Sequence, residues 1–422
     1  MRFTTLEQWL DWQSGLHPSE IEMGLARVSA VWRRLCPEGL SSRVVTVAGT
    51  NGKGSCVAML DAIYRQAGYR VATYTSPHLI RYNERIRLNG VSIDDHRLCQ
   101  AFDAVDKARD KTTLTYFEFG TLAALYLFAQ SPPDVVILEV GLGGRLDAVN
   151  IIDTDLALIT TIDIDHQNWL GETREAIGRE KAGIMRSGRP AVLADPAMPE
   201  SVFAEARRLG AEVMAAGRDY HWRENTEGWH WSGPDGVALN LPKPALRGAW
   251  QLQNAAAVVM VIQALNPQLP VDESGLSAGL AGIRLPGRQQ MVPGHPPVLL
   301  DVAHNCQAVK GLASSLEQIA PQTRIRAVFG LLRDKDATAI ASLLSARIEA
   351  WYLMDLPGER GQTSEKLADA LQLGGVGSPI HTYRNFRDAF QGALGSARED
   401  ELILVFGSFI VVGEALHYLG IE

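Results

Sequence analysis

Short apolar runs alternate with amphipathic stretches of helical period along most of this 422-residue chain. Alternation of this kind is typical of an α/β fold in which most strands are parallel. The runs that predict strands are Val44–Ala48, Val135–Leu138, Leu156–Thr160, Val298–Asp301, Arg326–Phe329 and Leu402–Phe406. The clearest helical patterns are Ile21–Leu35, Ser55–Ala67, Glu118–Ala129 and Asn254–Ala264. We therefore expect an α/β protein built on a mostly parallel sheet.

One segment departs from this alternation. Gly217–Leu241 is rich in tryptophan, glycine and asparagine, and Trp222, Trp229 and Trp231 are spaced as residues of strands. Because loops and hairpins vary freely at protein surfaces, we interpret this segment as a β-hairpin insertion without direct chemistry.

The length of the chain exceeds what one hydrophobic core usually serves, which favours two domains. The segment 285–297, LPGRQQMVPGHPP, is rich in proline, which fixes φ and lacks an N–H group. Such a stretch is typical of a linker. We therefore expect a first domain over residues 1–284, a linker over 285–297 and a second domain over 298–422.

Composition and charge narrow the class of protein. The net charge is −8 and the pI about 5.7, which argues against general nucleic-acid binding. The four cysteines contain no C-x-x-C pair, so neither a disulfide framework nor a zinc site is indicated. The N-terminal stretch does not resemble a secretory signal, and no apolar run is long enough for a membrane span. A soluble enzyme of the reducing cytoplasm is expected.

The most informative stretch runs from a β-branched strand through Gly49-Thr50-Asn51-Gly52-Lys53-Gly54-Ser55 into a helix. Glycines let backbone N–H groups turn toward a phosphate, and the helix N-terminus adds further donors and partial positive charge. Lys53 is placed to reach the terminal phosphates, and the Ser55 hydroxyl to hold magnesium. The loop departs from the strict G-x-x-x-x-G-K-[ST] pattern, yet its strand–loop–helix context predicts binding of ATP with magnesium.

Acidic and histidine residues follow two of the predicted strands. Glu139 ends one apolar run, and Asp163, Asp165 and His166 follow the next. Ligands gather at the carboxyl ends of strands in open α/β sheets, so these groups are candidates for holding a metal ion. The alternatives are a capping or salt-bridged glutamate and a structural histidine. By spacing alone, Lys181 is expected on a solvated helix face, paired with a neighbouring glutamate.

Taken together, the motifs resemble the folylpolyglutamate synthase family of Mur-type ATP-dependent amide ligases. They are GTNGKGS (49–55), TSPHLIRYNERIRLNG (75–90), TYFEFGTLAAL (115–125), LEVGLGGRLDAVN (138–150), DHQNWLG (165–171), GREKAGI (178–184), LPGR (285–288), DVAHN (301–305), GLLRDKD (330–336) and FGSF (406–409). They cover nearly the whole chain in the expected order. The similarity is greatest to the bacterial bifunctional members, which act as dihydrofolate synthase and folylpolyglutamate synthase.

This resemblance implies a P-loop N-terminal domain and a smaller Rossmann-like C-terminal domain, with ATP bound between them. It implies that a carboxylate of dihydropteroate or a reduced folate attacks the γ-phosphate to give an acyl phosphate. The amine of L-glutamate then displaces phosphate. A monomer is expected, because members of this architecture usually close the cleft within one chain.

The resemblance also implies roles for single residues. Lys53, His166 and Lys181 match catalytic positions, with Lys181 carried as a carbamate. Two magnesium ions are implied, with ligands at Ser55, Ser76, Glu139, His166 and the modified Lys181. ATP would be held by the phosphate loop, Asn254, Arg288, Asp301 and His304. The pterin substrate would be held by Ile21, Glu22, Met23, Leu114, Thr115, Tyr116, Phe117, Arg145, Leu146 and Asp147. The alternative for these positions is core packing together with a salt bridge of the arginine.

Other functions remain open at this point. A monofunctional folylpolyglutamate synthase would carry the same motifs. A Mur ligase acting on a UDP-sugar would share the chemistry, but a separate domain before the P-loop at Gly49 would be expected. A P-loop kinase or GTPase-like switch, or a non-catalytic nucleotide-binding module, would leave Lys181, DVAHN and the second domain without a role.

Overall fold

The computed structural model describes residues 1–421, which form two compact units. The first contains Met1–Ala245 and Leu252–Ile283, and the second contains Leu246–Gln251 and the chain from Arg284 onward. The segment predicted as a linker over 285–297 therefore lies within the second unit, where part of it forms a strand. None of the helices in residues 1–421 is both long enough and apolar enough to cross a membrane.

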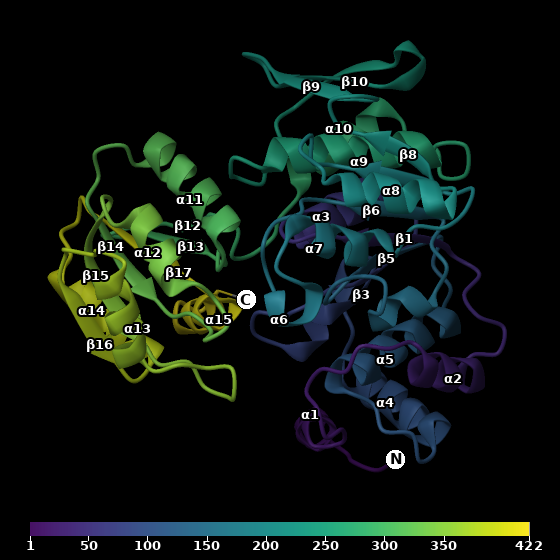
Figure 1. The fold of residues 1–422 in the computed structure, drawn as a ribbon, viewed down its shortest axis with the longest axis horizontal. Coiled ribbons are helices and arrows are strands. Elements are labelled where there is room, and N and C mark those ends of the chain that lie inside the picture. The colour runs from purple at the N-terminus through teal and green to yellow at the C-terminus, as the bar shows by residue number, and fades with distance from the viewer. Residues whose placement is uncertain (422) are drawn as a thin grey trace. The chain divides into compact units, whose positions relative to one another are not determined.

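The first unit is built on an eight-stranded sheet in the order β4-β3-β2-β5-β1-β6-β7-β8 (Figure 1). Its strands are β1 Arg43–Ala48, β2 Val71–Tyr74, β3 Ile86–Leu88, β4 Val91–Ser92, β5 Val135–Glu139, β6 Leu156–Ile159, β7 Pro190–Leu193 and β8 Glu212–Ala215. Neighbouring strands in the series β2-β5-β1-β6-β7-β8 are parallel. Strands β3 and β4 add an antiparallel edge next to β2. The expected mostly parallel sheet is thus confirmed.

Helices cover both faces of this sheet. They are α1 Leu6–Ser14, α2 Ala26–Leu35, α3 Lys53–Gln66, α4 Asp95–Arg109, α5 Tyr116–Gln130, α6 Gln167–Leu170, α7 Arg174–Ala182, α8 Glu200–Leu209, α9 Gln251–Leu265 and α10 Glu273–Gly282. Three 3₁₀ turns accompany them: η1 Tyr82–Arg85, η2 Ala148–Ile151 and η3 Pro234–Gly236. Val136 and Leu138 of β5 share a core with Phe119 of α5, while α3 packs on β1, β2 and β5. Because strand side chains alternate, α3 occupies the opposite face from α5.

The predicted helix over Ile21–Leu35 was wrong at its start, since α2 begins only at Ala26. Gly24 disfavours helix, and the Glu22 side chain is held by Arg27 in a segment without regular structure. Residues 21–23, which the resemblance assigns to the substrate pocket, therefore lie before the helix and not within it.

The tryptophan-rich insertion forms three strands rather than a hairpin. Strands β9 His221–Glu224, β10 Trp229–Ser232 and β11 Ala238–Leu241 make an antiparallel sheet in the order β11-β10-β9. This small sheet lies beside α9 and α10 in Figure 1. Trp229 and Trp231 are fully buried, and the Trp231 indole N–H donates to the Ala256 carbonyl of α9 at 3.1 Å. The insertion is therefore anchored to the unit rather than being a simple surface excursion.

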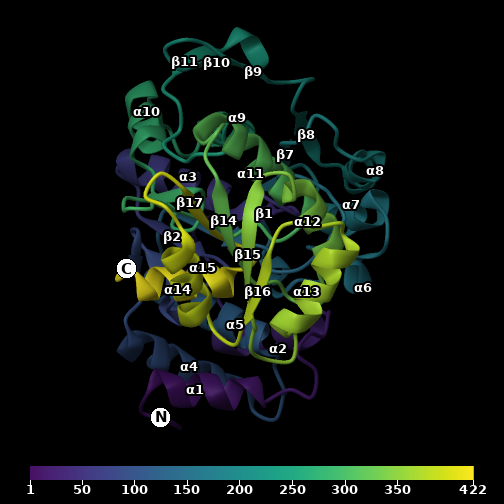
Figure 2. The ribbon, with the colours of Figure 1, turned by 90° about the vertical axis from the view of Figure 1, so that its left-hand side faces the viewer.

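The second unit has its own six-stranded sheet in the order β12-β13-β17-β14-β15-β16. Its strands are β12 Gln290–Val292, β13 Val298–Asp301, β14 Ile325–Phe329, β15 Ile348–Met354, β16 Ile380–Tyr383 and β17 Leu402–Phe406. All pairs are parallel except β12 with β13, so proline-flanked β12 forms an antiparallel edge. Its helices are α11 Cys306–Ile319, α12 Ala337–Leu344, α13 Ser364–Leu373, α14 Phe386–Ser396 and α15 Phe409–Tyr418. Figure 2 shows β14, β15 and β16 in a row, with α12 and α13 next to one another.

Candidate active site

The loop Gly49–Ser55 joins β1 to α3, and its shape depends on glycine. Gly49 has a φ of +152° and Gly52 a φ of +91°, both in a region that favours glycine. A Cβ at Gly49 would lie 1.7 Å from Thr160 Oγ1, and a Cβ at Gly52 would lie 2.7 Å from Asn254 Oδ1. The loop backbone thus packs directly against Thr160, which follows β6, and against Asn254 of α9.

The chain after β6 holds this loop in place. Thr160 Oγ1 donates to the Asn51 carbonyl at 2.6 Å, and Thr50 Oγ1 donates to the Asp163 carbonyl at 3.1 Å. The Asp163 N–H in turn donates to Thr50 Oγ1 at 3.0 Å. No side chain caps the N-terminus of α3, which begins at Lys53. The backbone donors of its first turn are therefore well placed for an anion such as a phosphate.

Two lysines converge on one carbonyl of the loop. Lys53 Nζ donates to the Gly49 carbonyl at 3.1 Å, and Lys181 Nζ donates to the same oxygen at 3.0 Å. Lys181 is buried, so its prediction as a solvated helix residue was wrong. Burial and, next, the positive charge of Lys53 lower the pKa of Lys181 to about 7. A large fraction of this amine is therefore neutral near neutral pH, whereas an exposed lysine is almost wholly charged.

Glu139 and Ser76 lie together at the carboxyl ends of β5 and β2. The Ser76 N–H donates to Glu139 Oε2 at 3.2 Å, and the Glu139 side chain is buried. Burial and, next, the charge of Glu139 raise the pKa of the Cys56 thiol, which places the carboxylate near the first turn of α3. Ser55, also buried, lies in that turn. The structure thus gathers Ser55, Ser76 and Glu139 around the phosphate loop.

His166 lies in the chain beyond β6 and begins the short helix α6. Its φ is +52°, and its N–H donates to Asp165 Oδ1 at 2.8 Å. Asp165 and Lys181 are close enough for the carboxylate to favour the charged form of Lys181. His166 therefore lies on the same side of the first unit as Lys181.

Metal binding at these groups would need further oxygen ligands. No three His, Cys, Asp or Glu side chains among residues 1–421 come together in a geometry that could hold a metal ion. The candidate donors Ser55, Ser76 and Glu139 supply two hydroxyls and one carboxylate, a set that suits magnesium completed by water and nucleotide phosphates. The chemistry of this donor set therefore fits a magnesium–nucleotide complex.

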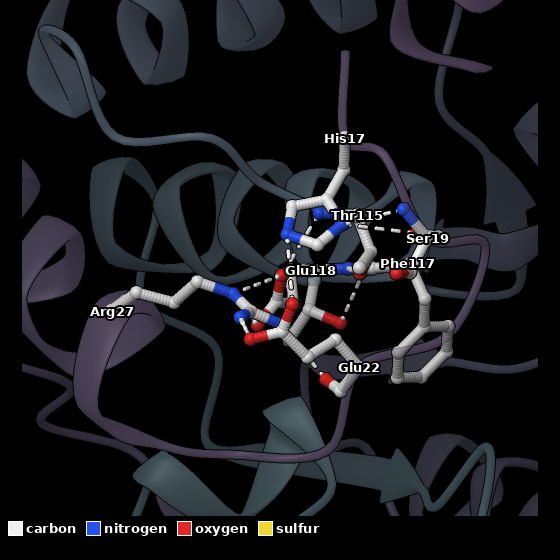
Figure 3. Close-up of polar contacts among 8 residues, drawn as sticks. His17, Ser19, Glu22, Arg27, Thr115, Phe117 and Glu118 are labelled. Atoms are coloured by element: carbon white, nitrogen blue, oxygen red, sulfur yellow. Dashed lines mark hydrogen bonds and ion pairs between the residues drawn. The ribbon is translucent and has the colours of Figure 1, made fainter. Parts of the chain in front are cut away.

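The segments predicted to hold the pterin substrate lie together in the first unit. Glu22 is linked to α5 through Arg27, which pairs with both Glu22 and Glu118 (Figure 3). Phe117 reaches the loop after β5, where a Cβ at Gly141 would lie 2.6 Å from its ring. Met23 approaches the same loop, since a Cβ at Gly143 would lie 3.3 Å from Met23 Cε. Three segments far apart in sequence thus meet.

Not every predicted substrate residue presents its side chain there. Leu114 is fully buried in the core, and Thr115 caps α5 by accepting from the Glu118 N–H at 3.3 Å. Tyr116 and Leu146 are only partly buried. Arg145 is half-exposed and pairs with Glu180 at 2.9 Å. The salt-bridge alternative weighed for the arginine is therefore what the structure contains.

Asp147 is buried at the start of η2. It accepts from the Leu142 N–H at 2.8 Å and the Val149 N–H at 3.0 Å. Burial nevertheless dominates and raises the pKa of Asp147 to about 6. Its carboxylate fixes the loop after β5, which also carries Arg145 and Leu146.

In the second unit, three of the predicted ATP-binding residues gather at the carboxyl end of β13. Burial raises the pKa of Asp301, while Arg288 acts against this rise. Asp301 accepts from the Gln289 N–H at 3.0 Å and the Ala303 N–H at 2.7 Å. The Arg288 guanidinium lies 5.3 Å from the Phe409 ring, and the His304 ring lies 6.1 Å from it. The linker arginine, DVAHN and FGSF motifs therefore form one cluster.

Sequence reasoning did not single out Arg27, Thr160 or Glu118. Glu118 stands three residues after Thr115, which is the spacing of a capping box, so its place at the start of α5 was readable. Arg27 pairs with a residue 91 positions away, and no local pattern indicates such a contact.

Comparison with known proteins defines the class. The Mur ligase middle domain family matches residues 47–262, and the glutamate ligase domain of Mur ligases matches residues 287–409. The chain is 40% identical to the dihydrofolate synthase/folylpolyglutamate synthase of Escherichia coli over 98% of this chain and 95% of that protein. It is 33% identical to the protein of the same name from Bacillus subtilis, over 98% of each chain. The chain therefore belongs to the dihydrofolate synthase/folylpolyglutamate synthase family.

Solved structures agree with this assignment. A structure of Escherichia coli FolC in complex with DHPP and ADP has a TM-score of 0.92 at 40% identity, covering 99% of this chain and 98% of that one. A bifunctional folylpolyglutamate synthase/dihydrofolate synthase with Mn, AMPPNP and L-glutamate bound has a TM-score of 0.91 at 41% identity, over the same shares. The α/β fold expected from the sequence is thus the fold of this family.

Proposed function

We propose that this chain is an ATP-dependent ligase that joins L-glutamate to dihydropteroate and to tetrahydrofolates. The observation that carries the proposal is the meeting of Lys53 and Lys181 at the Gly49 carbonyl, beside an uncapped helix N-terminus. A simple nucleotide switch has no use for a second, buried lysine there. The family supplies the reaction in which both have a role.

The first step is transfer of a phosphoryl group. The backbone N–H groups of residues 49–55 hold the triphosphate, and Lys53 neutralises charge on its terminal phosphates. A carboxylate oxygen of the acceptor attacks the γ-phosphorus, the bond to the β-phosphate bridging oxygen breaks, and ADP leaves. Magnesium held by Ser55, Ser76 and Glu139 would supply further charge neutralisation. The product is an acyl phosphate of the acceptor.

The second step forms the amide. The neutral amine of L-glutamate attacks the acyl carbon and gives a tetrahedral intermediate. Its collapse breaks the carbon–oxygen bond to phosphate, and the amine loses its proton. The products are the glutamyl amide, ADP and inorganic phosphate.

Lys181 is proposed to act as a carbamate. Its lowered pKa, about 7, leaves neutral amine that can attack CO₂, forming a C–N bond and releasing one proton. The carbamate is an anion, so it turns a group that repels metal ions into a ligand. Together with His166 it would hold a second magnesium ion.

The remaining contacts are proposed by family resemblance. Asn254, Arg288, Asp301 and His304 would hold ATP. The segments Ile21–Met23, Leu114–Phe117 and Arg145–Asp147 would hold the pterin, and their meeting in the structure supports this assignment. Leu114 packs in the core and Thr115 caps α5. Tyr116 and Phe117 are therefore the better candidates for contact with the flat ring.

We further propose that the enzyme is cytoplasmic, works as a monomer and needs neither nucleic acid nor a membrane. The net charge of −8 and the set of small-molecule substrates support these assignments.

Phosphate release by the purified protein tests the proposal. With MgATP and L-glutamate, we expect release with dihydropteroate and with tetrahydrofolate, and loss of at least about a hundredfold in Lys53→Ala. Release with only tetrahydrofolate would point to a monofunctional folylpolyglutamate synthase. Binding of ATP without release in the presence of either acceptor would contradict the folate assignment.

A further inference from the structure

Arg27 connects two of the segments proposed to bind the acceptor. It lies in the first turn of α2, and its side chain is largely buried. Its Nε donates to both carboxylate oxygens of Glu118, at 2.9 and 3.0 Å (Figure 3). Its Nη2 donates to the Glu22 carbonyl at 2.8 Å, and its Nη1 contacts Glu22 Oε1. One guanidinium therefore joins the start of α2, the start of α5 and the chain at residue 22.

The Glu118 carboxylate stabilises the start of α5. Its Oε2 accepts from the Thr115 N–H at 2.8 Å, which closes the capping box, and its side chain is 4% exposed. A buried carboxylate is costly unless a cation pairs with it, and Arg27 is that cation. Because Tyr116 and Phe117 lie between Thr115 and Glu118, Arg27 is tied to the part of α5 that is proposed to meet the substrate.

The chain from 16 to 25 has no helix or strand of its own. Polar contacts therefore contribute much to its conformation. His17 contacts two residues of this segment. Its Nδ1 accepts from the Ser19 N–H at 3.2 Å, and its Nε2 lies 3.1 Å from Glu22 Oε2. Glu22 is thus held between His17 and Arg27, which positions Ile21 and Met23 on either side of it.

We infer that Arg27 is a positioning residue that fixes the Ile21–Met23 segment against the N-terminus of α5 and thereby sets the affinity for the pterin acceptor. It acts through Glu22 and Glu118 rather than through contact with the reacting atoms. This inference rests on the proposed function, in which these two segments bind the acceptor. The KM values for ATP and L-glutamate should not depend on Arg27, because Arg27 contacts Glu22 and Glu118 and not the phosphate loop.

Steady-state kinetics of Arg27→Gln test the inference. The variant keeps hydrogen-bonding capacity but loses the charge, and we expect the KM for dihydropteroate to rise about tenfold or more. The KM values for ATP and L-glutamate should stay within about twofold of wild type. Arg27→Lys, which keeps the charge, should recover part of the lost affinity. Arg33 lies at an exposed position on the same helix, and its Nε donates to the Ser29 carbonyl one turn earlier. Arg33→Gln is therefore the matched control and should leave all three KM values unchanged.

Hydrogen exchange gives a second readout that does not depend on turnover. In Arg27→Gln without acceptor, amides of residues 16–25 should exchange faster, while those of β1, β5 and α3 keep wild-type protection. If Arg27→Gln does not fold, the KM values and the hydrogen exchange are both measured on Arg27→Lys.

An unchanged KM for dihydropteroate, or a parallel rise in all three KM values, would overturn the inference. A fall in kcat alone would overturn it as well. Absence of turnover in the wild-type enzyme with any pterin acceptor would instead mean that the proposed function itself has failed.

Discussion

At the residue scale, Gly49 has the least freedom to vary in the phosphate loop, because a Cβ there would collide with Thr160. We predict that Gly49→Ala lowers the free energy of unfolding of the first unit by about 2–4 kcal/mol and abolishes ATP binding. Gly282→Ala is the control, since a Cβ there meets nothing within 4 Å, and it should be neutral in denaturant titration. Equal stability of the two variants would show that the loop tolerates a side chain.

Also at this scale, Glu401 of the second unit pairs with Arg326, with Nε and Oε2 2.6 Å apart. Burial acts to raise the pKa of Glu401, but hydrogen bonds from Arg326 and the Arg398 N–H outweigh it and leave the pKa below its ordinary value. A carboxyl with a depressed folded-state pKa stabilises the fold above its unfolded pKa, about 4.3, and this contribution is lost as pH falls through the lower, folded value.

We therefore predict that Glu401→Gln destabilises the protein by about 3 kcal/mol at pH 7. The difference from wild type should shrink between about pH 5 and pH 3, measured by urea unfolding at each pH. A difference that stays constant over this range would show that the charge of Glu401 does not contribute.

At the scale of elements, the insertion β9–β11 supports α9, the helix that brings Asn254 to the phosphate loop. Trp231 is fully buried and bonded to the Ala256 carbonyl, whereas Trp222 is only partly buried. We predict that Trp231→Ala costs about 3–5 kcal/mol in unfolding free energy and that Trp222→Ala costs less than about 2 kcal/mol. Equal costs would mean that the sheet does not support α9.

Sequence patterns predicted the long, strongly apolar elements best, for physical reasons. Strands β1, β5 and β13 are buried on both faces and read as continuous apolar runs. Edge strand β12 carries flanking prolines and was taken for a linker, and the short strands of the insertion were read as a hairpin. The start of α2 was misplaced because Gly24 disfavours helix and because Arg27, which is paired with the distant Glu118, holds Glu22 in an irregular segment.

Residues of the candidate site could be predicted from the sequence pattern only where they lie close together in the chain. The phosphate loop shows its glycines and lysine in one stretch, so its geometry could be anticipated. The burial of Lys181 and its shared contact with Gly49 could not, because they depend on residues 132 positions apart. The proposed role of Lys181 as a carbamate came from the family resemblance and not from spacing.

At the scale of the whole molecule, each unit has its own sheet and its own cluster of residues that are proposed to bind substrates. In the proposed ligase reaction the acceptor carboxylate is activated as an acyl phosphate before L-glutamate attacks. Oxygen tracing distinguishes this order of steps from direct attack. Dihydropteroate labelled with ¹⁸O at both carboxylate oxygens is turned over with MgATP and L-glutamate, and the released phosphate is analysed by mass spectrometry. Each released phosphate should carry one ¹⁸O atom, alongside a glutamylated product. Unlabelled phosphate with the same product would contradict this order of steps.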